Sequence, residues 1–424
     1  MKVLVIGSGG REHAICHAFS NSPKVSKLYC ANGNAGISRI AECVYLSPTD
    51  IPGLLDFALT NAIDLTFVGG ESSLALGIVD AFQSSGLRIV GPSRAATQLE
   101  SSKAFAKDFM ARHGVPTAKY ATANSPMEAV ELLNRGEFGD VATPVVVKAD
   151  GLAAGKGVVV AKDRAEAIAA IDDMASLVGE DAAEKIVLEE CLFGKEVSLL
   201  MFADGDDYVL MPPTRDHKRI GEGDTGPNTG GMGTITDAGL LPGDEIEDIK
   251  ESIIEPTLRG CVDEGFRFRG ILFLGLMMTE SGPKLLEYNV RFGDPETQAI
   301  LVRLKTDLVD ICEAMLDGNL SSLDVVWRRG SSACVVLAAE NYPAKPRTGD
   351  LISGIKAASE VPNVSVFHAG TSALTVDEYY TAGGRVLGVT AVGDTLDNAL
   401  ATAYSAVAKI SWNGMQYRRD IGRT

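Results

Sequence analysis

The chain has 424 residues, of which 46% are hydrophobic, enough for two to four globular domains with substantial cores. Its formal net charge of −17 argues against a general nucleic-acid-binding or acidic-membrane surface, because the overall field repels anions. Any anionic ligand must therefore be bound by local groups.

The sequence indicates a cytoplasmic protein. Its seven cysteines are scattered and never form a C-x-x-C pair, which is typical of reduced thiols and not of a disulfide frame or a zinc site. The apolar run at the N-terminus ends after a few residues in glycines and charges, so it predicts a strand and not a signal peptide. No apolar segment is long enough to span a bilayer. We therefore expect neither nucleic acid nor membrane among the partners.

The first hundred residues are predicted to form a Rossmann-like domain with a parallel sheet. Buried strands such as VLVIG alternate with amphipathic helices, the first from about Arg11 to Ser20, and this alternation is typical of a right-handed parallel α/β fold. Ligands of such sheets bind beyond the carboxyl ends of the strands. The segments GSGGRE and GGESS are expected at that edge.

The middle of the chain is predicted to hold a small α+β subdomain and a larger, mostly antiparallel one. A helix in SSKAFAKDFMARH, with Ser101 or Ser102 as its N-cap, leads into this region as a hinge. In the smaller subdomain, the strands PVVVKAD, GVVVAK and KIVLEE accompany a helix at 164–177. The larger subdomain is expected to contain one helix at 247–265 and another at 296–316.

The last hundred residues are short strands punctuated by glycines, followed by one helix at 397–410. This composition predicts a small β-rich domain, folded as a barrel or sandwich. The expected domains are 1–101, an N-terminal parallel α/β domain; 102–325, with subdomains 118–190 and 191–325; and 326–424, the β-rich domain.

The loop GSGGREHA follows the first strand and could bring backbone N–H groups to a phosphate. It does not match a dinucleotide fingerprint: Gly7 and Gly9 are in place, but Glu12 occupies the third glycine position. Two interpretations remain open. The loop binds a phosphate-bearing substrate, or its glycines only make a tight turn between strand and helix.

The segment VVVKADGLAAGKGVVVA joins two strands through a glycine-rich loop. Lys148 enters the loop and Lys156 lies inside it. Glycine amides can approach a polyphosphate, and the two ammonium groups would neutralise part of its charge. The spacing is not that of a Walker A loop. The alternative is a flexible hairpin with exposed lysines.

Two further stretches have the composition of ligand-binding segments. In KIVLEECLFGKEVSLL, two strands could present backbone groups to a purine edge and Glu196 to ribose hydroxyls, although an acidic turn is usually solvated. In TRDHKRIGEGDTGPNTGGMG, basic residues precede a long glycine-rich segment. Such segments are uncommon unless they contact a ligand, and an anionic substrate suits this one. A disordered surface loop is the alternative.

The run LLEYNVRFGDPETQ alternates apolar and polar residues with the period of a strand. Glu287, Asn289 and Arg291 therefore share one face. Mg²⁺ prefers hard oxygen ligands and is usually held by one or two carboxylates together with substrate phosphates. Glu287 and Asn289 supply such oxygens, and Arg291 could stabilise charge on a transferring phosphoryl group or an acyl phosphate. The run therefore predicts phosphoryl transfer.

The order of these motifs resembles the ATP-grasp ligases, and within them the phosphoribosylamine–glycine ligase family. The resemblance extends over essentially the whole chain, through GGREHA, SKAFAKDFMARH, VVVKADGLAAGKGV, DHKRIGEGDTGPNTGGMG, EYNVRFGDPETQ and the late GGRVLGVTA. It implies an ATP-grasp fold and a ligase that uses ATP to activate glycine as glycyl phosphate. The amine of 5-phosphoribosylamine would then attack, giving glycinamide ribonucleotide, ADP and phosphate in purine biosynthesis.

The resemblance also implies roles for residues in these motifs. Those implied for ATP are Lys103, Lys148, Gly151, Gly155, Lys156, Gly157, Glu189, Glu190, Leu192 and Glu196. Those implied for Mg²⁺ or Mn²⁺ are Glu287 and Asn289. Those implied for glycine and the phosphoribosyl amine are Gly9, Gly10, Arg11, Glu12, Asp216, Asn228, Thr229, Gly230, Gly231 and Arg291. Those implied for catalysis are Arg291, Asp294 and Lys148.

The sequence departs from the family pattern in the expected phosphoribosyl-amine pocket. Ser8 stands where the family commonly has Asn, and VGGESSL, with Gly70, Ser72 and Ser73, stands for the usual VGPEAPL. Two alternatives are another ATP-grasp ligase or carboxylase, and a nucleotide-binding regulator without catalysis. Either a monomer or a small homo-oligomer is compatible with the sequence.

Overall fold

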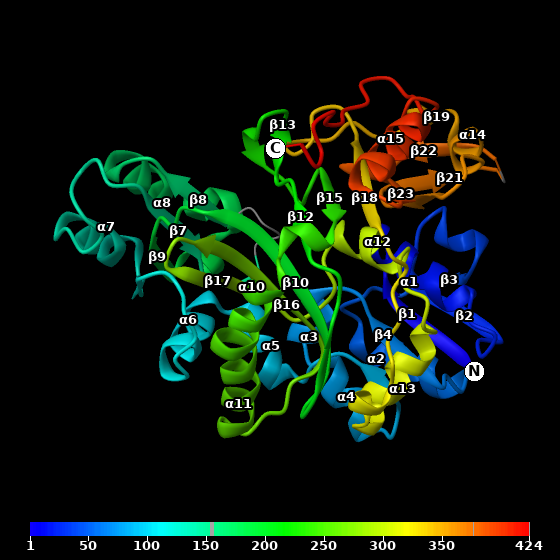
Figure 1. Cartoon of the computed structure of the whole chain (residues 1–424), viewed down its shortest axis with the longest axis horizontal. Helices are drawn as coiled ribbons and strands as arrows, with labels where there is room; N and C mark the ends of the chain where they lie inside the picture. Colours follow the sequence, from blue (N-terminus) through cyan, green and yellow to red (C-terminus); the bar gives the residue numbers. More distant parts are fainter. Residues whose placement is uncertain (153–156, 376, 424) are drawn as a thin grey trace.

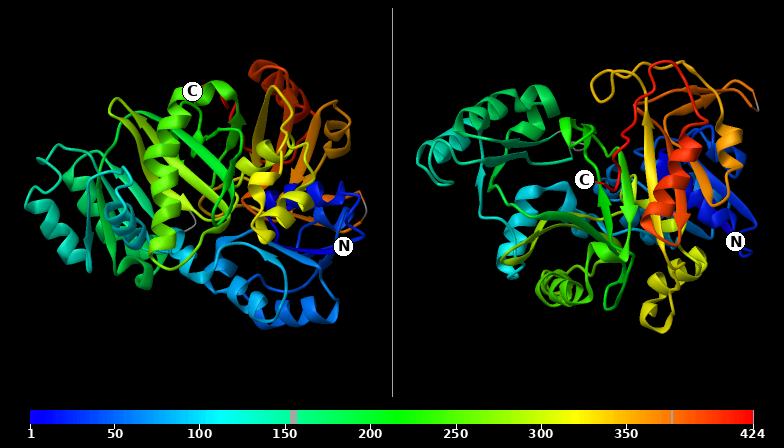
Figure 2. Two further views of the ribbon diagram at one scale, coloured as in Figure 1. Left: turned by 60° about the horizontal axis from the view of Figure 1, so that its bottom comes forward. Right: turned by 45° about the horizontal axis from the view of Figure 1, so that its top comes forward.

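The computed structural model describes residues 1–152, 157–375 and 377–423 (Figure 1). A parallel sheet near the N-terminus and a small sheet on the opposite side of the molecule flank a long antiparallel sheet (Figures 1 and 2). Within the described residues, no helix has the length and apolar character needed to cross a bilayer. Gly155 and Lys156, expected to contact ATP, lie outside the described part of the chain.

The N-terminal region is a five-stranded parallel sheet flanked by helices. Its elements are β1 Lys2–Gly7, α1 Gly10–Ser20, β2 Lys27–Asn32, a 3₁₀ turn Ile37–Arg39, β3 Glu42–Val44, α2 Ile51–Thr60, β4 Leu65–Val68, α3 Glu71–Ala75, α4 Ile78–Ser84, β5 Ile89–Val90 and α5 Arg94–Ser101. The order β3-β2-β1-β4-β5 places β1 at the centre. The first four residues of β1 after Lys2 are fully buried, as expected for a central parallel strand. The predicted parallel α/β fold is confirmed.

The next segment forms a hinge helix and a small subdomain. Its elements are α6 Lys103–Arg112, β6 Tyr120–Ala123, α7 Pro126–Asn134, β7 Val145–Ala149, β8 Val158–Ala161, α8 Arg164–Val178, α9 Glu180–Ala183 and β9 Ile186–Glu190. Ser102 caps α6, because its hydroxyl accepts a hydrogen bond from the Phe105 amide at 3.1 Å. The strands pair antiparallel in the order β6-β9-β7-β8. Val147, Leu188 and Met174 belong to a separate apolar cluster of this subdomain, which projects away from the N-terminal sheet (Figure 1).

A long antiparallel sheet occupies the middle of the molecule. Its strands and the hairpin beside them are β10 Lys195–Asp204, β11 Tyr208–Leu210, β12 Thr214–Asp216, β13 Arg219–Gly221, β14 Thr225–Asn228, β15 Gly233–Thr236, β16 Arg269–Thr279 and β17 Gly282–Asn289. The sheet runs β17-β16-β10-β12-β15, and β11 pairs with β10. β13 and β14 form a separate hairpin between β12 and β15, so the glycine-rich segment has an ordered backbone here.

Helices lie between β15 and β16 and after β17, and one of the two helices predicted here differs from the observed ones. They are a 3₁₀ turn Ala238–Leu240, α10 Gly243–Ile249, a π-helical turn Lys250–Ile254, α11 Glu255–Asp263, α12 Glu296–Leu301, α13 Leu308–Asp317 and a 3₁₀ turn Leu320–Ser322. The single helix expected at 296–316 is wrong, because α12 and α13 are separate. The Lys305 amide donates to the Val326 carbonyl at 3.0 Å instead of continuing a helix. Asp307 then caps α13 by accepting from the Val309 amide.

The C-terminal region is β-rich, as predicted. Its elements are β18 Ser331–Ala338, β19 Leu351–Ile352, α14 Ile355–Ser359, β20 Val364–His368, β21 Thr371–Ala373, β22 Tyr379–Thr381, β23 Arg385–Gly393 and α15 Leu396–Val407. β18 pairs with β15, so β18, β23 and β20 continue the long sheet. β19, β22 and β21 form a smaller sheet, and the apolar face of α15 packs on β18 and β23. This connection places residues of the last hundred beside the N-terminal loop.

Candidate active site

β17 carries Glu287 and Asn289 to the centre of the molecule. Its pairing with β16 shifts register between Gly275, opposite Glu287, and Leu276, opposite Leu285. The extra residue is Leu286, which is only half-buried, whereas Tyr288 and Val290 are buried. The predicted alternation therefore holds from Glu287 onward and is interrupted before it by a bulge, a feature that can redirect side chains near functional sites.

The Glu287 carboxylate lies in a field of positive charge. Burial opposes its ionisation, but Lys218, Lys148 and Lys103 outweigh burial and lower its pKa below the usual value. Among the residues that the structure describes, none donates a hydrogen bond to this carboxylate, and the Asn289 Oδ1 beside it accepts only from Arg291, at 3.2 Å. Two hard oxygens with spare acceptor capacity suit a divalent cation that is completed by phosphate oxygens.

Glu189 lies between two ammonium groups inside the protein. Its Oε1 is 2.7 Å from Lys148 Nζ and its Oε2 is 2.9 Å from Lys107 Nζ, and all three side chains are buried. Lys107 also donates to the Thr117 hydroxyl, which donates to the Leu285 carbonyl of β17. Burial lowers the pKa of Lys107 to about 8. Sequence reasoning missed Lys107, although it lies one helical turn from Lys103 on the same face of α6.

Lys103 lies at the start of α6 and points toward the glycine loop. Its Nζ donates to the Gly151 carbonyl at 3.0 Å, and burial lowers its pKa although Glu287 opposes this shift. Asp150 accepts from the Ala104 amide and the Ser102 hydroxyl, so it ties the loop to the helix N-terminus. Gly157 is the first described residue after 152, and its carbonyl accepts a hydrogen bond from the Ala149 amide.

The residues predicted for adenine and ribose lie around the β9–β10 connection. Glu190 is exposed and accepts from the Lys119 amide at 2.8 Å. Leu192 is half-buried in the connection itself. Glu196 is exposed at the start of β10, where its carboxylate lies 3.3 Å from Lys218 Nζ. The structure therefore brings Glu196 within reach of the same lysine that lowers the Glu287 pKa.

Arg291 follows β17 and contacts two acids that the sequence did not identify. Its guanidinium lies 3.2 Å from Glu71 and 2.8 Å from Glu100. Burial raises the pKa of Glu100, while Arg291 opposes this rise. Arg291 also donates to the Phe292 carbonyl. Glu71 lies in GGESS, which was expected at the ligand-binding edge of the parallel sheet. This expected position was the signal in the sequence that could have identified Glu71 as a site residue.

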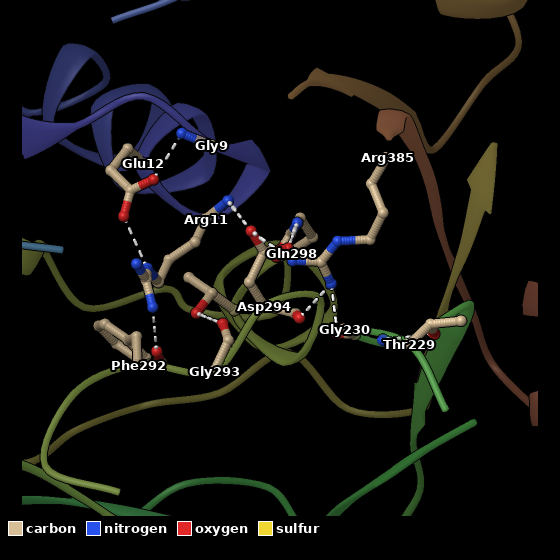
Figure 3. A network of polar contacts seen from close by, with 12 residues as sticks. Gly9, Arg11, Glu12, Thr229, Gly230, Phe292, Gly293, Asp294, Gln298 and Arg385 are labelled. Carbon is tan, nitrogen blue, oxygen red and sulfur yellow. Dashed lines mark hydrogen bonds and ion pairs between the residues drawn. The ribbon is translucent and has the colours of Figure 1, made fainter. Parts of the chain in front are cut away.

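Asp294 joins three parts of the chain (Figure 3). Its carboxylate accepts from the Gln298 amide at 2.8 Å and from the Arg11 backbone N–H at 3.5 Å, and lies 3.4 Å from the Arg385 guanidinium. Burial opposes ionisation, but Arg385 and Arg11 lower the Asp294 pKa. Arg385 also donates to the Gly230 carbonyl. Neither Gln298 nor Arg385 was selected from the sequence.

The Glu12 side chain folds back onto the N-terminal loop and bonds to it. Glu12 accepts from the Gly9 amide and from Arg11 Nε, both at 2.6 Å (Figure 3). Its side chain fills the space beside Gly7 and Gly69, where any Cβ would collide with it. The glycines are therefore required by a close approach of the Glu12 side chain. Gly10 begins α1 behind this loop.

The residues in which the sequence departs from the family pattern surround this loop. The Ser8 carbonyl accepts from Nδ2 of the Asn34 side chain at 2.8 Å. Ser73 is buried, and its hydroxyl donates to the Pro48 carbonyl at 2.7 Å. Gly70 is the N-cap of α3, and a Cβ there would approach the Arg11 guanidinium. Gly70 thus borders Arg11, whereas the Ser73 hydroxyl is bonded to the loop that contains Pro48.

The glycine-rich segment reaches the same region from the other side. Thr229 donates from its amide and hydroxyl to the Lys218 carbonyl, both at 2.8 Å, and accepts at that hydroxyl from Gly231. Asn228 pairs with Arg219 across the β13–β14 hairpin. Gly231 has φ of +110° and packs on Pro295, which leaves no room for a Cβ. The hairpin base therefore adjoins the turn that carries Asp294.

Two acids lie between these clusters, the half-buried Asp216 and the buried Glu296. Burial raises the pKa of Asp216, although Lys218 opposes this rise. Burial and the nearby Asp216 raise the pKa of Glu296 to about 7. Glu296 begins α12, at the start of the helix predicted at 296–316, and its side chain is buried. The site thus combines a cationic half around Glu287 with a paired-charge half around Asp294.

Family models cover nearly the whole chain. The N domain of phosphoribosylglycinamide synthetase matches residues 1–100, its ATP-grasp (A) domain matches 101–297, and its C domain matches 332–424.

Curated relatives and a solved structure agree with these matches. The chain is 45% identical to a phosphoribosylamine–glycine ligase of Caldanaerobacter subterraneus, over 99% of each protein. It is 47% identical to that of Xanthomonas axonopodis, over 100% of this chain and 97% of the relative. The crystal structure of a phosphoribosylamine–glycine ligase from Thermotoga maritima superposes with a TM-score of 0.85 at 34% identity, covering 99% of this chain and 100% of the other.

Proposed function

The chain belongs to the phosphoribosylglycinamide synthetase family, and from this premise we propose that it is an ATP-dependent ligase joining glycine to 5-phosphoribosylamine. In the first step, the glycine carboxylate attacks the γ-phosphorus of ATP, which forms glycyl phosphate and releases ADP. In the second, the amine attacks the acyl carbon, a C–N bond forms, and phosphate and a proton leave. The product is glycinamide ribonucleotide, an intermediate of purine biosynthesis.

The observation that carries the proposal is the cluster of lysines around Glu287. Lys103, Lys148 and Lys218 are close enough to lower the pKa of that carboxylate, and together they would attract a polyphosphate. Lys148 is oriented by Glu189. We assign ATP phosphates to Lys103 and Lys148, of which Lys103 contacts Gly151. Adenine is assigned to the strand end at Glu189 and Glu190 and to the backbone at Leu192, and ribose to Glu196.

The side-chain oxygens of Glu287 and Asn289 suit a divalent cation. Glu287 and Asn289 would hold Mg²⁺ or Mn²⁺ through the two oxygens described above, with phosphate oxygens completing the shell. Such a cation neutralises phosphate charge and orients the γ-phosphoryl group for attack. The lowered pKa of Glu287 keeps the carboxylate in the ionised form that binding requires.

Arg291 and Asp294 continue from β17 toward the proposed amine side of the site. Arg291 lies beside Asn289, so its guanidinium can reach charge that develops on an acyl phosphate. Asp294 contacts the Arg11 amide at the N-terminal loop. We therefore assign glycine and the phosphoribosyl amine to this turn, the N-terminal loop and residues 228–231 at the base of the hairpin, together with Asp216. Catalysis of this kind needs positioning, charge neutralisation and exclusion of water, and no nucleophilic side chain.

The test is a phosphate-release assay in which each reactant is omitted in turn. We expect release to require ATP, Mg²⁺, glycine and freshly made phosphoribosylamine together. Release that persists without glycine would overturn the assignment and favour another ATP-grasp reaction, such as a carboxylation. A protein that binds ATP without any release would favour the regulatory alternative.

A further inference from the structure

The C-terminal segment, residues 418–422, connects the end of the chain to the β13–β14 hairpin. Its Arg418 side chain is 0% exposed and donates to four acceptors. Nε and Nη2 donate to the two Asp420 carboxylate oxygens at 2.8 and 2.7 Å, and Nη1 donates to Asp224 at 2.6 Å and to the Arg219 carbonyl at 3.2 Å. A buried guanidinium is tolerated only when its N–H groups are paired. Arg418 therefore depends on the hairpin, and the hairpin on Arg418.

The same segment holds the hairpin at its tip and at its base. At the tip, the Gly223 amide donates to Asp420 at 2.7 Å, and the Arg419 amide donates to Glu222 at 3.3 Å. At the base, the Gly422 amide donates to His217 Nε2 at 3.0 Å. Attachment at both ends restricts the hairpin against hinge motion in either direction.

The restrained hairpin carries residues of the proposed substrate site. Lys218 lies directly after His217. Its ammonium group is 3.3 Å from Glu196 and is attracted by the Glu287 carboxylate. Thr229 is bonded to Lys218 across the hairpin base. The Gly230 carbonyl accepts from Arg385, which also contacts Asp294. Movement of the hairpin would therefore displace both the cationic half and the Asp294 half of the site.

We propose that the C-terminal segment is a positioning element for the ligase, in which Arg418 holds the hairpin so that Lys218, Thr229 and Gly230 face the reactants. This inference rests on the proposed function for the identity of the reactants. Arg418 itself touches none of the assigned reactant-binding residues with its side chain; it acts through Asp224 and Arg219. Small misplacements of positioned groups can reduce rates by about a hundredfold. We therefore expect loss of the attachment to lower mainly the turnover rate.

Two variants break the attachment from opposite sides. Arg418→Ala removes the buried guanidinium. Asp224→Asn removes the charge at the half-exposed hairpin tip and keeps the backbone, because Asp224 has φ of +53° and Asn tolerates this conformation. Arg418→Lys retains the charge. The matched control is Arg419→Gln: Arg419 is the neighbouring residue of the same segment, but its side chain is 72% exposed and makes a solvent-screened 3.5 Å ion pair with Glu222.

The readouts are amide hydrogen exchange of the ligand-free full chain and steady-state kinetics. We expect the amides of residues 219–228 to exchange at least about tenfold faster in Arg418→Ala and less so in Asp224→Asn, with the strands of the N-terminal sheet unchanged. We expect kcat to fall about tenfold or more in Arg418→Ala, the Kd of an ATP analogue to change less than about twofold, and Arg418→Lys to recover part of the rate. Arg419→Gln should match the unsubstituted protein.

Three results separate the possibilities. Unchanged exchange in the hairpin of Arg418→Ala and Asp224→Asn would overturn the proposal. Faster exchange throughout the chain, with kcat and ATP affinity falling together, would also overturn it, because Arg418 would then serve general stability. Absence of glycine-dependent phosphate release in the unsubstituted protein would instead overturn the proposed function, and the exchange measurement would still decide whether Arg418 holds the hairpin.

Discussion

The ammonium group of Lys148 lies 2.7 Å from Oε1 of Glu189, and both side chains are buried. The same carboxylate pairs with Lys107, so its loss would leave two buried cations without an opposite charge. We predict that Glu189→Gln lowers the free energy of unfolding by about 3 kcal/mol, as expected for breaking a buried ion pair. It should also weaken ATP-analogue binding, because Lys148 loses its orientation. Urea denaturation and a fluorescence titration measure the two effects.

Glu190 provides the control for this prediction. It is the next residue of β9, but it is exposed, and its carboxylate accepts a hydrogen bond from the Lys119 backbone amide. Glu190→Gln is therefore expected to change the free energy of unfolding by less than about 1 kcal/mol. Equal destabilisation by the two substitutions would show that the burial of Glu189 between lysines does not matter for stability.

Glu287→Ala should abolish turnover without unfolding the protein. The substitution removes the carboxylate that we assign to the divalent cation, and loss of such charge stabilisation reduces kcat by about a thousandfold. Glu280, in the exposed turn before β17, offers a matched Glu→Ala control that should keep full activity. Circular dichroism melts establish the folding of each variant, and phosphate release gives the rate. Near-normal turnover in folded Glu287→Ala would disprove the metal assignment.

Arg291 tests whether charge alone is sufficient at the proposed acyl phosphate. Lysine keeps the charge but cannot reproduce the planar fork that now contacts Glu71, Glu100 and Asn289. We expect Arg291→Lys to lower kcat about a hundredfold and to leave the Kd of an ATP analogue within about threefold. The exposed Arg267 gives an equivalent Arg→Lys control. A change confined to nucleotide affinity would move Arg291 from the acyl phosphate to the ATP side.

Sequence patterns predicted the parts of the fold that depend on local chemistry. Ser102 was one of two candidate N-caps, and the structure shows that its hydroxyl caps α6. The parallel sheet follows from alternating strands and helices, whose hydrophobic periods are visible in the sequence. The interruption between α12 and α13 was not predictable in this way, because residues 302–307 have helical periodicity and are diverted by a hydrogen bond to Val326.

The candidate site shows the same division between local and distant information. Glu287, Asn289 and Arg291 are two residues apart on one strand, so their common face could be predicted. Arg385 lies about ninety positions after Asp294, its partner at 3.4 Å. Only the continuation of the long sheet through β18 and β23 brings them together. Each residue lies in a motif that the family resemblance selected, but a single sequence carries no signal that the two motifs meet.

Stability should decline in mild acid because of buried histidines between the N-terminal loop and the C-terminal region. The His368 amide donates to His13 Nδ1 at 2.7 Å, and both rings are buried. Burial lowers the pKa of His368 to about 4 and that of His13 to about 3. Below pH 6.5 these histidines bind protons in the unfolded chain but not in the folded protein. Their contribution to the free energy of unfolding is therefore fully present above pH 6.5 and declines as the pH falls toward 4.

Substitution of His368 measures this effect. A histidine whose pKa is about 4 in the folded protein and about 6.5 in the unfolded chain lowers the free energy of unfolding by roughly 2 kcal/mol when the pH falls from 7 to 5. His368→Gln should therefore lose about 2 kcal/mol less than the unsubstituted protein over this interval, whatever its stability at pH 7, while His13 preserves the remaining slope. Urea denaturation at the two pH values gives the difference. An unchanged slope in the variant would mean that His368 is already protonated in the folded protein at pH 5.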